Sequence, residues 1–167
     1  MINLIREWGI PAPLQGKNVD FVFSPDEILD TINNLKNQHV KNYYNDLHCR
    51  DGSVKFCLYD FDPRKIVFTM DFFKVVDFFN NGNELNSDRI KLQILYVNDP
   101  ELRNKGIAKY YIKKLQEYAI QEGISCIKLH PNPNDKLFMN KENALSKKQL
   151  IDFYNNMSNE QVTIKIE

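Results

Sequence analysis

The sequence predicts an α/β (α+β) fold: a mixed, mostly antiparallel sheet of about six strands, with helices on both faces. The predicted elements follow the order strand, one or two helices, three strands, and then helix, strand, helix, strand. Consecutive strands favour an antiparallel meander, and each strand-helix-strand unit favours a crossover connection. The 167 residues are enough for one domain with a sizeable core.

The first 18 residues are expected to form an irregular lead-in, and residues 19–167 the domain itself. Pro11, Pro13 and Gly16 interrupt regular structure in the lead-in. Trp8 is expected to anchor this segment to the body of the protein.

The first strand is predicted at Val19–Phe23, where apolar residues bracket Asp20. Ser24 follows as a candidate N-cap, with Pro25 suited to the first helical position and Glu27 completing a capping box. Residues 39–46 either continue that helix or begin a second one.

Three strands are predicted next, at Val54–Tyr59, Ile66–Val76 and Ile90–Val97. The pair Asp51–Gly52 indicates a turn before the first of them. Asn81–Gly82 indicates a hairpin-type turn before the last, although that connection is longer than a minimal hairpin.

The stretch from Ile90 to Gly123 organises the prediction, because a buried strand, a polar loop and a long amphipathic helix follow one another in it. One face of the strand is expected to carry Ile90, Leu92, Ile94 and Tyr96, while Leu95 and Val97 make its other face apolar near the end. Apolar residues at the spacing of one buried helix face are Ile107, Ala108, Tyr111, Ile112, Leu115, Tyr118 and Ala119. Gly123 is the expected C-cap.

The C-terminal part alternates strand and helix. A strand at Ile124–His130 stops at Pro131, and residues 131–145 are polar and irregular. A second capping box at Ser146 opens the last helix, and Gln161–Ile166 alternates as the last strand.

Composition excludes several classes of protein. Lys plus Arg and Asp plus Glu both number 22, so there is no basic surplus for sequence-independent binding of nucleic acid. No apolar run is long enough for a membrane span, and the N-terminus does not resemble a signal peptide. The three cysteines are scattered, with no metal-type spacing. We therefore expect a cytoplasmic protein with reduced thiols, no metal site and no membrane partner.

The residues from Arg103 to Ala108 lie where the long helix must begin, directly after the strand. Unpaired backbone N–H groups and the helix dipole favour an anion there, and Gly106 permits close approach to the backbone. Arg103 and Lys105 add positive charge. The segment therefore predicts an anion site suited to a diphosphate. It has neither the Walker order nor the G-x-G-x-x-G order.

The pattern Arg-x-x-Gly-x-Ala between a strand and a helix resembles the acetyl-CoA-binding signature of the GNAT acetyltransferase superfamily. The order of elements is similar to the GNAT fold over roughly residues 19–166. The resemblance implies an acetyl-CoA-dependent N-acetyltransferase that moves the acetyl group from the thioester directly to an amine. It implies that the cofactor is held by Leu95, Tyr96, Val97, Arg103, Asn104, Lys105, Gly106, Ile107 and Ala108, with the backbone of the first three along the pantetheine arm.

The resemblance also implies a catalytic acid. Phe153–Tyr154 is similar to a Phe-Tyr pair whose tyrosine protonates the departing thiolate in many members, and a phenol is a suitable acid for that group. The loop before Arg103 is one residue longer than the commonest family spacing. Asn155 and the residues after it differ from the pattern that commonly follows the tyrosine, and Lys147 replaces an asparagine that often contacts CoA.

The general base is left open by the sequence. Several relatives place a carboxylate on the central strand where this chain has Lys91 and Gln93. His130, at the end of the following strand, has the most suitable ordinary pKa. Asp60 or Asp62, or a water relay without a dedicated base, are the alternatives.

Two other functions are compatible with the sequence: a catalytically inactive GNAT-like module that binds acyl-CoA or a protein, and a plain α/β interaction domain in which Arg103–Ala108 only begins a helix. The amine acceptor cannot be identified. Relatives often have one further strand at the end, so we expect a homodimer to complete the sheet.

Overall fold

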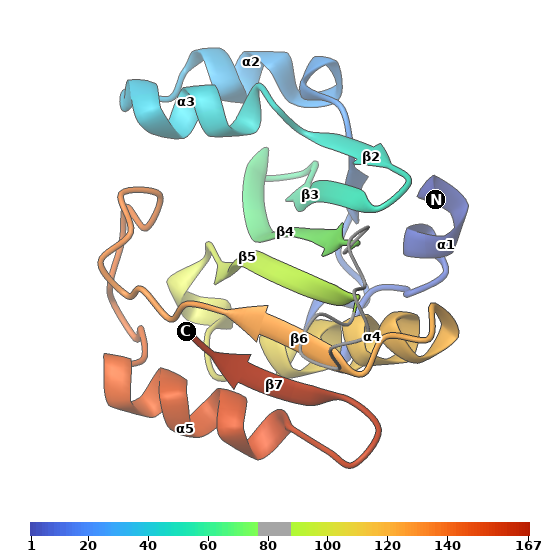
Figure 1. The fold of residues 1–167 in the computed structure, drawn as a ribbon. Helices are drawn as coiled ribbons and strands as arrows, with labels where there is room; N and C mark the ends of the chain where they lie inside the picture. The colour runs from blue at the N-terminus through green and yellow to red at the C-terminus, as the bar shows by residue number, and fades with distance from the viewer. Residues whose placement is uncertain (77–87) are drawn as a thin grey trace.

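The structure, a computed structural model, describes residues 1–76 and 88–167, so the predicted turn at Asn81–Gly82 lies outside the described residues. The described part forms one sheet of seven strands in the order β1-β3-β4-β5-β6-β7, with β2 paired to β3 (Figure 1). Pairing is antiparallel from β1 to β5, and parallel from β5 through β6 to β7. The strands are β1 (Val19–Val22), β2 (His48–Arg50), β3 (Ser53–Asp60), β4 (Lys65–Val75), β5 (Arg89–Val97), β6 (Cys126–Leu129) and β7 (Thr163–Ile166).

The predicted mixed, mostly antiparallel sheet with helices on both faces is confirmed. The extra strand is β2, whose three residues are too few to show an alternating pattern. The helices are α1 (Ile2–Arg6), α2 (Leu29–Asn33), α3 (Gln38–Tyr44), α4 (Ile107–Gln121) and α5 (Lys147–Met157), with 3-10 turns at Ala12–Leu14, Pro25–Ile28 and Pro100–Leu102. None of the helices in the described ranges is long and apolar enough to cross a membrane.

Two clusters of buried side chains lie on opposite faces of the sheet. Phe56 packs in the cluster that includes α1, α4 and α5, whereas its neighbour Cys57 packs in the cluster that includes α2 and α3. Successive residues of a strand point to opposite faces, so the two groups of helices cover different sides of β3. Figure 1 shows α2 and α3 together above the sheet, and α4 and α5 at its other end.

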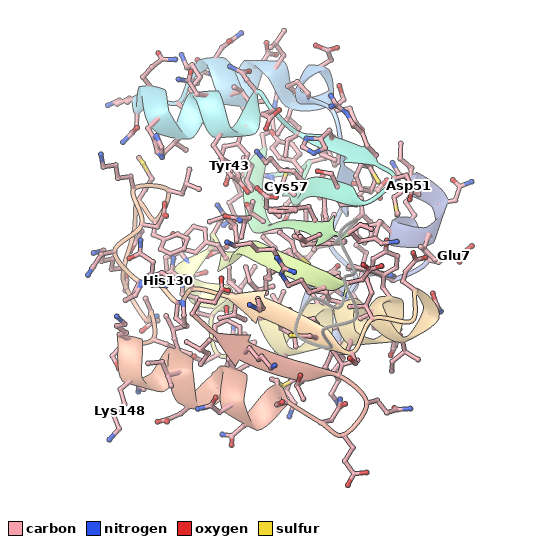
Figure 2. The ribbon with its side chains drawn as sticks, viewed as in Figure 1. Glu7, Tyr43, Asp51, Cys57, His130 and Lys148 are labelled. Carbon is pink, nitrogen blue, oxygen red and sulfur yellow. The ribbon has the colours of Figure 1, made fainter. Side chains whose placement is uncertain are left out.

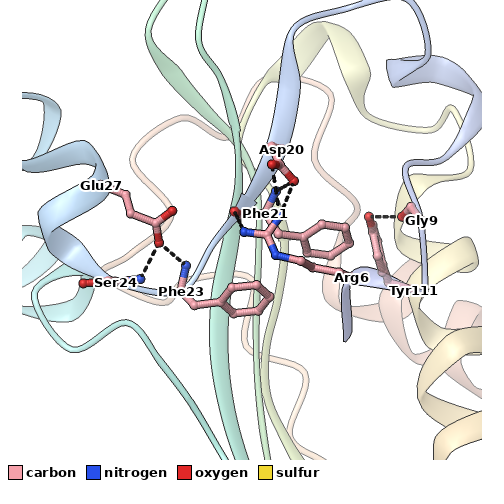
Figure 3. Close-up of polar contacts among 8 residues, drawn as sticks. All are labelled: Arg6, Gly9, Asp20, Phe21, Phe23, Ser24, Glu27 and Tyr111. Atoms are coloured by element: carbon pink, nitrogen blue, oxygen red, sulfur yellow. Dashed lines mark hydrogen bonds and ion pairs between the residues drawn. The ribbon is translucent and has the colours of Figure 1, made fainter. Parts of the chain in front are cut away.

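Both predicted capping boxes start helical segments. The Glu27 carboxylate accepts hydrogen bonds from the backbone N–H groups of Phe23 and Ser24, at 3.1 and 3.0 Å (Figure 3). The turn it opens is a 3-10 turn that leads into α2. At α5, Ser146 Oγ accepts from the Gln149 N–H at 3.3 Å, and Gln149 Oε1 accepts from the Ser146 N–H at 2.9 Å.

The N-terminal segment is more ordered than expected, because it contains α1 and a 3-10 turn. Trp8 is 6% exposed and stacks on Phe72 with ring centroids 5.8 Å apart, which confirms its anchoring role. The hydroxyl of Tyr111 on α4 donates to the Gly9 carbonyl at 3.0 Å, and Arg6 forms an ion pair with Asp20 at 2.8 Å (Figure 3). The lead-in is thus part of the main core.

A β-bulge divides β5 at Gln93 and corrects the predicted alternation. Asp71 pairs with Ile94 and Phe72 with Leu92, so Gln93 has no residue opposite it. One extra residue reverses the faces of those that follow. Leu95 and Val97 therefore pack on the same cluster as Ile90 and Leu92, and Ile94 and Tyr96 turn to the other face.

Candidate active site

A cleft forms where β5 and β6 separate. The two strands pair only from Ile90 to Leu92 on β5, opposite Ile127 to Leu129 on β6. Pro131 follows closely and disfavours continuation of a central strand, whereas β5 runs on to Val97. On the side that faced β6, residues 93–97 of β5 therefore have no neighbouring strand. Their backbone groups on that side have no partner strand, although the Val97 carbonyl accepts from the Arg103 guanidinium.

A cavity of about 290 Å³ occupies this cleft. β5, the beginning of α4, the segment 131–145 and α5 line it. The structure brings to its wall the predicted site residues Leu95, Tyr96, Val97, Arg103, Asn104, Ala108, His130 and Tyr154. Lys105, Gly106 and Ile107 do not line it: Lys105 and Gly106 are exposed beside it, and Ile107 is buried in the core.

The start of α4 lacks a side-chain cap. Its N-cap is Gly106, with φ of 88°, a left-handed conformation that glycine adopts without strain. By contrast, Asn37 caps α3 and Ser146 caps α5 with side-chain oxygens. The first N–H groups of a helix have no partners within it. Those of α4 are thus left for a ligand at the mouth of the cavity.

Arg103 lies 9% exposed at the inner end of this loop. Its guanidinium donates to the Val97 carbonyl at 2.9 Å, the Asn140 carbonyl at 2.7 Å, the Tyr96 hydroxyl at 2.8 Å and also the Glu142 carbonyl. All four acceptors are uncharged, and the described residues give Arg103 no carboxylate partner. A buried cation without a counter-charge favours an anion nearby. The sequence predicted the charge of Arg103 but not these internal contacts.

The segment 131–145 forms one wall of the cavity, which the sequence did not indicate. Phe138 stacks on Tyr96 with ring centroids 4.4 Å apart, and the Tyr96 hydroxyl donates to the Asn140 carbonyl at 3.2 Å. Asn104 Nδ2 donates to the Asn143 carbonyl at 3.3 Å. The only signal in the sequence is the position of this loop, directly after a strand end, where binding loops are often found.

Tyr154 reaches the cavity from α5, beside Leu150. It is 7% exposed, and within the described ranges its hydroxyl has no hydrogen-bond partner. Burial raises the pKa of this phenol well above its ordinary value. The side chain therefore keeps its proton at neutral pH and can give it to a strong base in the cavity.

The candidate bases lie in different places. His130 lies just after the end of β6 (Figure 2) and borders the cavity. Its Nδ1 is 2.6 Å from the Glu167 backbone oxygen. Asp60 and Asp62 do not line the cavity. Asp60 accepts from the Asp62 N–H at 3.3 Å, and Asp62 accepts from the Asn18 side chain at 3.0 Å.

The model of the acetyltransferase (GNAT) family matches residues 38–139. No curated protein sequence matches the chain significantly.

Solved structures share the fold at low sequence identity. An integron cassette protein from the mobile metagenome of V. cholerae is 14% identical, with a TM-score of 0.55 over 88% of each chain. An aminoglycoside N-acetyltransferase, AAC(6')-Iy, solved in complex with CoA, is 15% identical, with a TM-score of 0.54 over 95% of this chain and 97% of that one. An aminoglycoside 6'-N-acetyltransferase from Acinetobacter baumannii is 13% identical, with a TM-score of 0.53 over 90% and 95%. The family model covers more than half of the sequence and the sheet agrees with it, so the chain belongs to the GNAT acetyltransferase family.

Proposed function

We propose that the protein is an acetyl-CoA-dependent N-acetyltransferase that transfers the acetyl group directly from the thioester to an amine. One observation carries the proposal. The unpaired edge of β5, the uncapped start of α4 and the buried Arg103 all meet at one cavity. These three features are complementary to the parts of an acyl-CoA.

The residues present fit the diphosphate of this cofactor. Arg103 is a buried cation that the described residues do not neutralise, and Lys105 is an exposed cation two residues further on. The N–H groups and the dipole at the start of α4 add to the attraction. Lys105, Gly106, Ile107 and Ala108 would bind through the backbone, and Arg103 through its charge.

The backbone of β5 would hold the pantetheine arm. N–H and C=O groups of Leu95 to Val97 border the cavity at the end of the strand, where β6 no longer pairs with it. A backbone N–H aimed at the thioester oxygen stabilises the negative charge that develops there. Acetyl-CoA, when bound, supplies the acetyl group as a thioester that an amine can attack.

Tyr154 would hold the proton that the leaving thiolate needs. Its hydroxyl lies at the cavity with no partner among the described residues, and burial keeps it protonated. His130 also borders the cavity and is one candidate for the base, with Nδ1 bonded to the Glu167 oxygen.

The test is release of free thiol from acetyl-CoA in the presence of a panel of primary amines. The panel contains a polyamine, a lysine peptide and an aminoglycoside. The aminoglycoside is included because aminoglycoside acetyltransferases are among the structural neighbours. The expected result is amine-dependent thiol release, with an acetylated product found by mass spectrometry. Binding of acetyl-CoA without acetylation of any amine would instead support a module that only binds the cofactor.

A further inference from the structure

A row of side chains crosses three strands next to the cavity, on the face that α3 covers. Lys55 on β3 pairs with Asp71 on β4, and Asp71 pairs with Ile94 on β5. Side chains directly opposite on antiparallel strands lie about 5 Å apart at Cβ. Ile94 lines the cavity and Asp71 does not, so the Asp71 carboxylate lies one strand behind the cavity wall.

The two oxygens of Asp71 have different surroundings. Oδ2 accepts a hydrogen bond from the Tyr43 hydroxyl at 3.3 Å and lies 3.6 Å from Lys55 Nζ. Oδ1 has no hydrogen-bond partner in the described part of the chain, and it is not sealed from solvent. The side chain as a whole is 15% exposed. One oxygen is therefore held in place, and the other is free to accept a proton.

The charges around Asp71 favour a cation. Lys55 Nζ also lies 2.6 Å from Asp46, so two carboxylates share one ammonium group. Both ring nitrogens of His48 are occupied, by the Asp46 carbonyl and Ser53 Oγ. Lys55, Asp46, Tyr43 and His48 are thus the titratable groups around Asp71, and together they leave a net negative charge.

Burial raises the pKa of Asp71, which is the direction that suits a general base. Desolvation raises the pKa of this carboxyl above its ordinary value, while Lys55 and the Tyr43 hydrogen bond oppose the rise in part. A base is most effective when its pKa lies nearer the working pH. A carboxylate in this environment binds a proton more strongly than one exposed to water.

We propose that Asp71 is the general base of the transfer, and that Oδ1 takes the proton from the ammonium group of the acceptor. This role rests on the proposed function. The free amine then attacks the thioester carbon, a C–N bond forms, and the C–S bond breaks. The thiolate takes up one proton, which Tyr154 supplies and regains from the new amide nitrogen. The proton on Asp71 returns to solvent, so one ammonium and one thioester give one amide, one thiol and one proton.

The bulge at Gln93 explains why the base is on β4 in this chain. β5 offers Lys91 and Gln93 on the approach to the cavity, and neither is a suitable base. The extra residue in β5 sets Ile94 opposite Asp71. The carboxylate beside Ile94 on that face therefore comes from the neighbouring strand. Asp135 lines the cavity from the segment 131–145, where its Oδ1 accepts from the Leu137 N–H at 2.9 Å.

The experiment compares Asp71→Asn with His130→Gln and with Asp30→Asn, which changes an exposed carboxylate on α2. Asparagine can still accept the Tyr43 hydrogen bond, so the fold is retained. Thiol release is measured against pH with an amine from the panel, and with water as the nucleophile where no amine reacts. Acetyl-CoA binding is measured by calorimetry in the same samples.

The proposal expects Asp71→Asn to lower kcat/KM about 100-fold and to keep the Kd for acetyl-CoA. The wild-type rate should rise with pH through the pKa of Asp71, and the variant should lose that rise. Asp30→Asn should behave as wild type. Unchanged kcat/KM in Asp71→Asn, or a loss only in His130→Gln, overturns the proposal. Failure of the wild type to bind acetyl-CoA instead overturns the proposed function.

A second readout needs no turnover. The carboxyl ¹³C resonance of Asp71, assigned by its absence in Asp71→Asn, is titrated in the protein with acetyl-CoA. The proposal expects a pKa above the ordinary range of aspartate. A pKa at or below that range contradicts it, whatever the rates show.

Discussion

The Tyr154 side chain is 7% exposed, and its hydroxyl has no hydrogen-bond partner in the described residues. A buried polar group without a hydrogen bond costs about 1–3 kcal/mol. The hydroxyl of Tyr118 on α4 also has no partner among the described residues; it is fully buried, and Tyr118 does not line the cavity. Removing each hydroxyl in turn therefore distinguishes the effect of losing an unpaired hydroxyl from the loss of a group that acts at the site.

The first prediction concerns Tyr154→Phe. We expect kcat to fall about 100-fold, because a general acid is lost, with little change in the Kd for acetyl-CoA. Burial raises the pKa of the phenol, so the wild-type rate should show no fall from loss of this proton at mildly alkaline pH. Steady-state kinetics across that range provide the measurement.

Tyr118→Phe is the matched control for this prediction. It removes a buried, unpaired hydroxyl outside the cavity and should leave kcat unchanged. Equal kinetics of Tyr154→Phe and the wild type would exclude Tyr154 as the acid.

At the scale of single residues, the sequence could predict which residues approach the site but not their contacts. The pattern at Arg103–Ala108 placed a cation beside a helix start. It could not show that the Arg103 guanidinium binds Val97, Asn140 and Glu142, because two of these lie about 40 residues further along the chain. Asp71 could not be predicted as a site residue, because one acidic residue within an apolar strand forms no motif.

Among the elements, the N-terminal segment departs furthest from expectation. Prolines and a glycine predicted an irregular chain, yet α1 forms before them, and Ile5 of α1 and Trp8 after it both pack in the core. The hydroxyl groups of Tyr110 and Tyr111 donate to the carbonyls of Trp8 and Gly9, and so fix the segment to α4.

The second prediction follows from this packing. Trp8→Ala should lower the free energy of unfolding by about 3–5 kcal/mol, since a large buried aromatic is removed and a cavity remains. Urea unfolding followed by circular dichroism measures this change. Ile2→Ala, at a residue 44% exposed in the same N-terminal segment, should stay within about 0.5 kcal/mol of wild type. A similar small effect for Trp8→Ala would show that the segment is not part of the cooperative core.

Capping signals predicted helix starts well because they are local. Ser24 and Ser146 lie where the caps form. The C-cap of α4 is Glu122, and Gly123, the expected C-cap, is the next residue, with φ of 69°. The bulge at Gln93 could not be predicted, since it depends on the register between β4 and β5 rather than on either strand alone.

At the scale of the whole molecule, the order of elements was sufficient to predict the mixed sheet. Antiparallel meanders and right-handed crossovers leave few alternatives for such an order. The separation of β5 from β6, and the loop 131–145 that closes the cleft, could not be derived in the same way. They depend on where a strand stops pairing, and Pro131 is the only local indication of that point.

The third prediction concerns assembly, where a homodimer remains a proposal. β7 is the last strand in the described sheet and pairs there with β6 alone, so its other edge could accept a strand from a second copy. Size-exclusion chromatography with light scattering should give the mass of two chains. A clean monomer at micromolar concentration would contradict it.

The most direct test of the whole account is isothermal titration of the protein with acetyl-CoA, made with the wild type, Gly106→Glu and Gly16→Glu. Both glycines have φ near 80–90° and open space for a side chain, so each variant adds the same strain and the same charge. We expect micromolar binding in the wild type and in Gly16→Glu, and loss of binding in Gly106→Glu, because a carboxylate at the start of α4 repels the diphosphate. Equal binding by all three proteins, or no binding by the wild type, would contradict the assignment of the cofactor to this cavity.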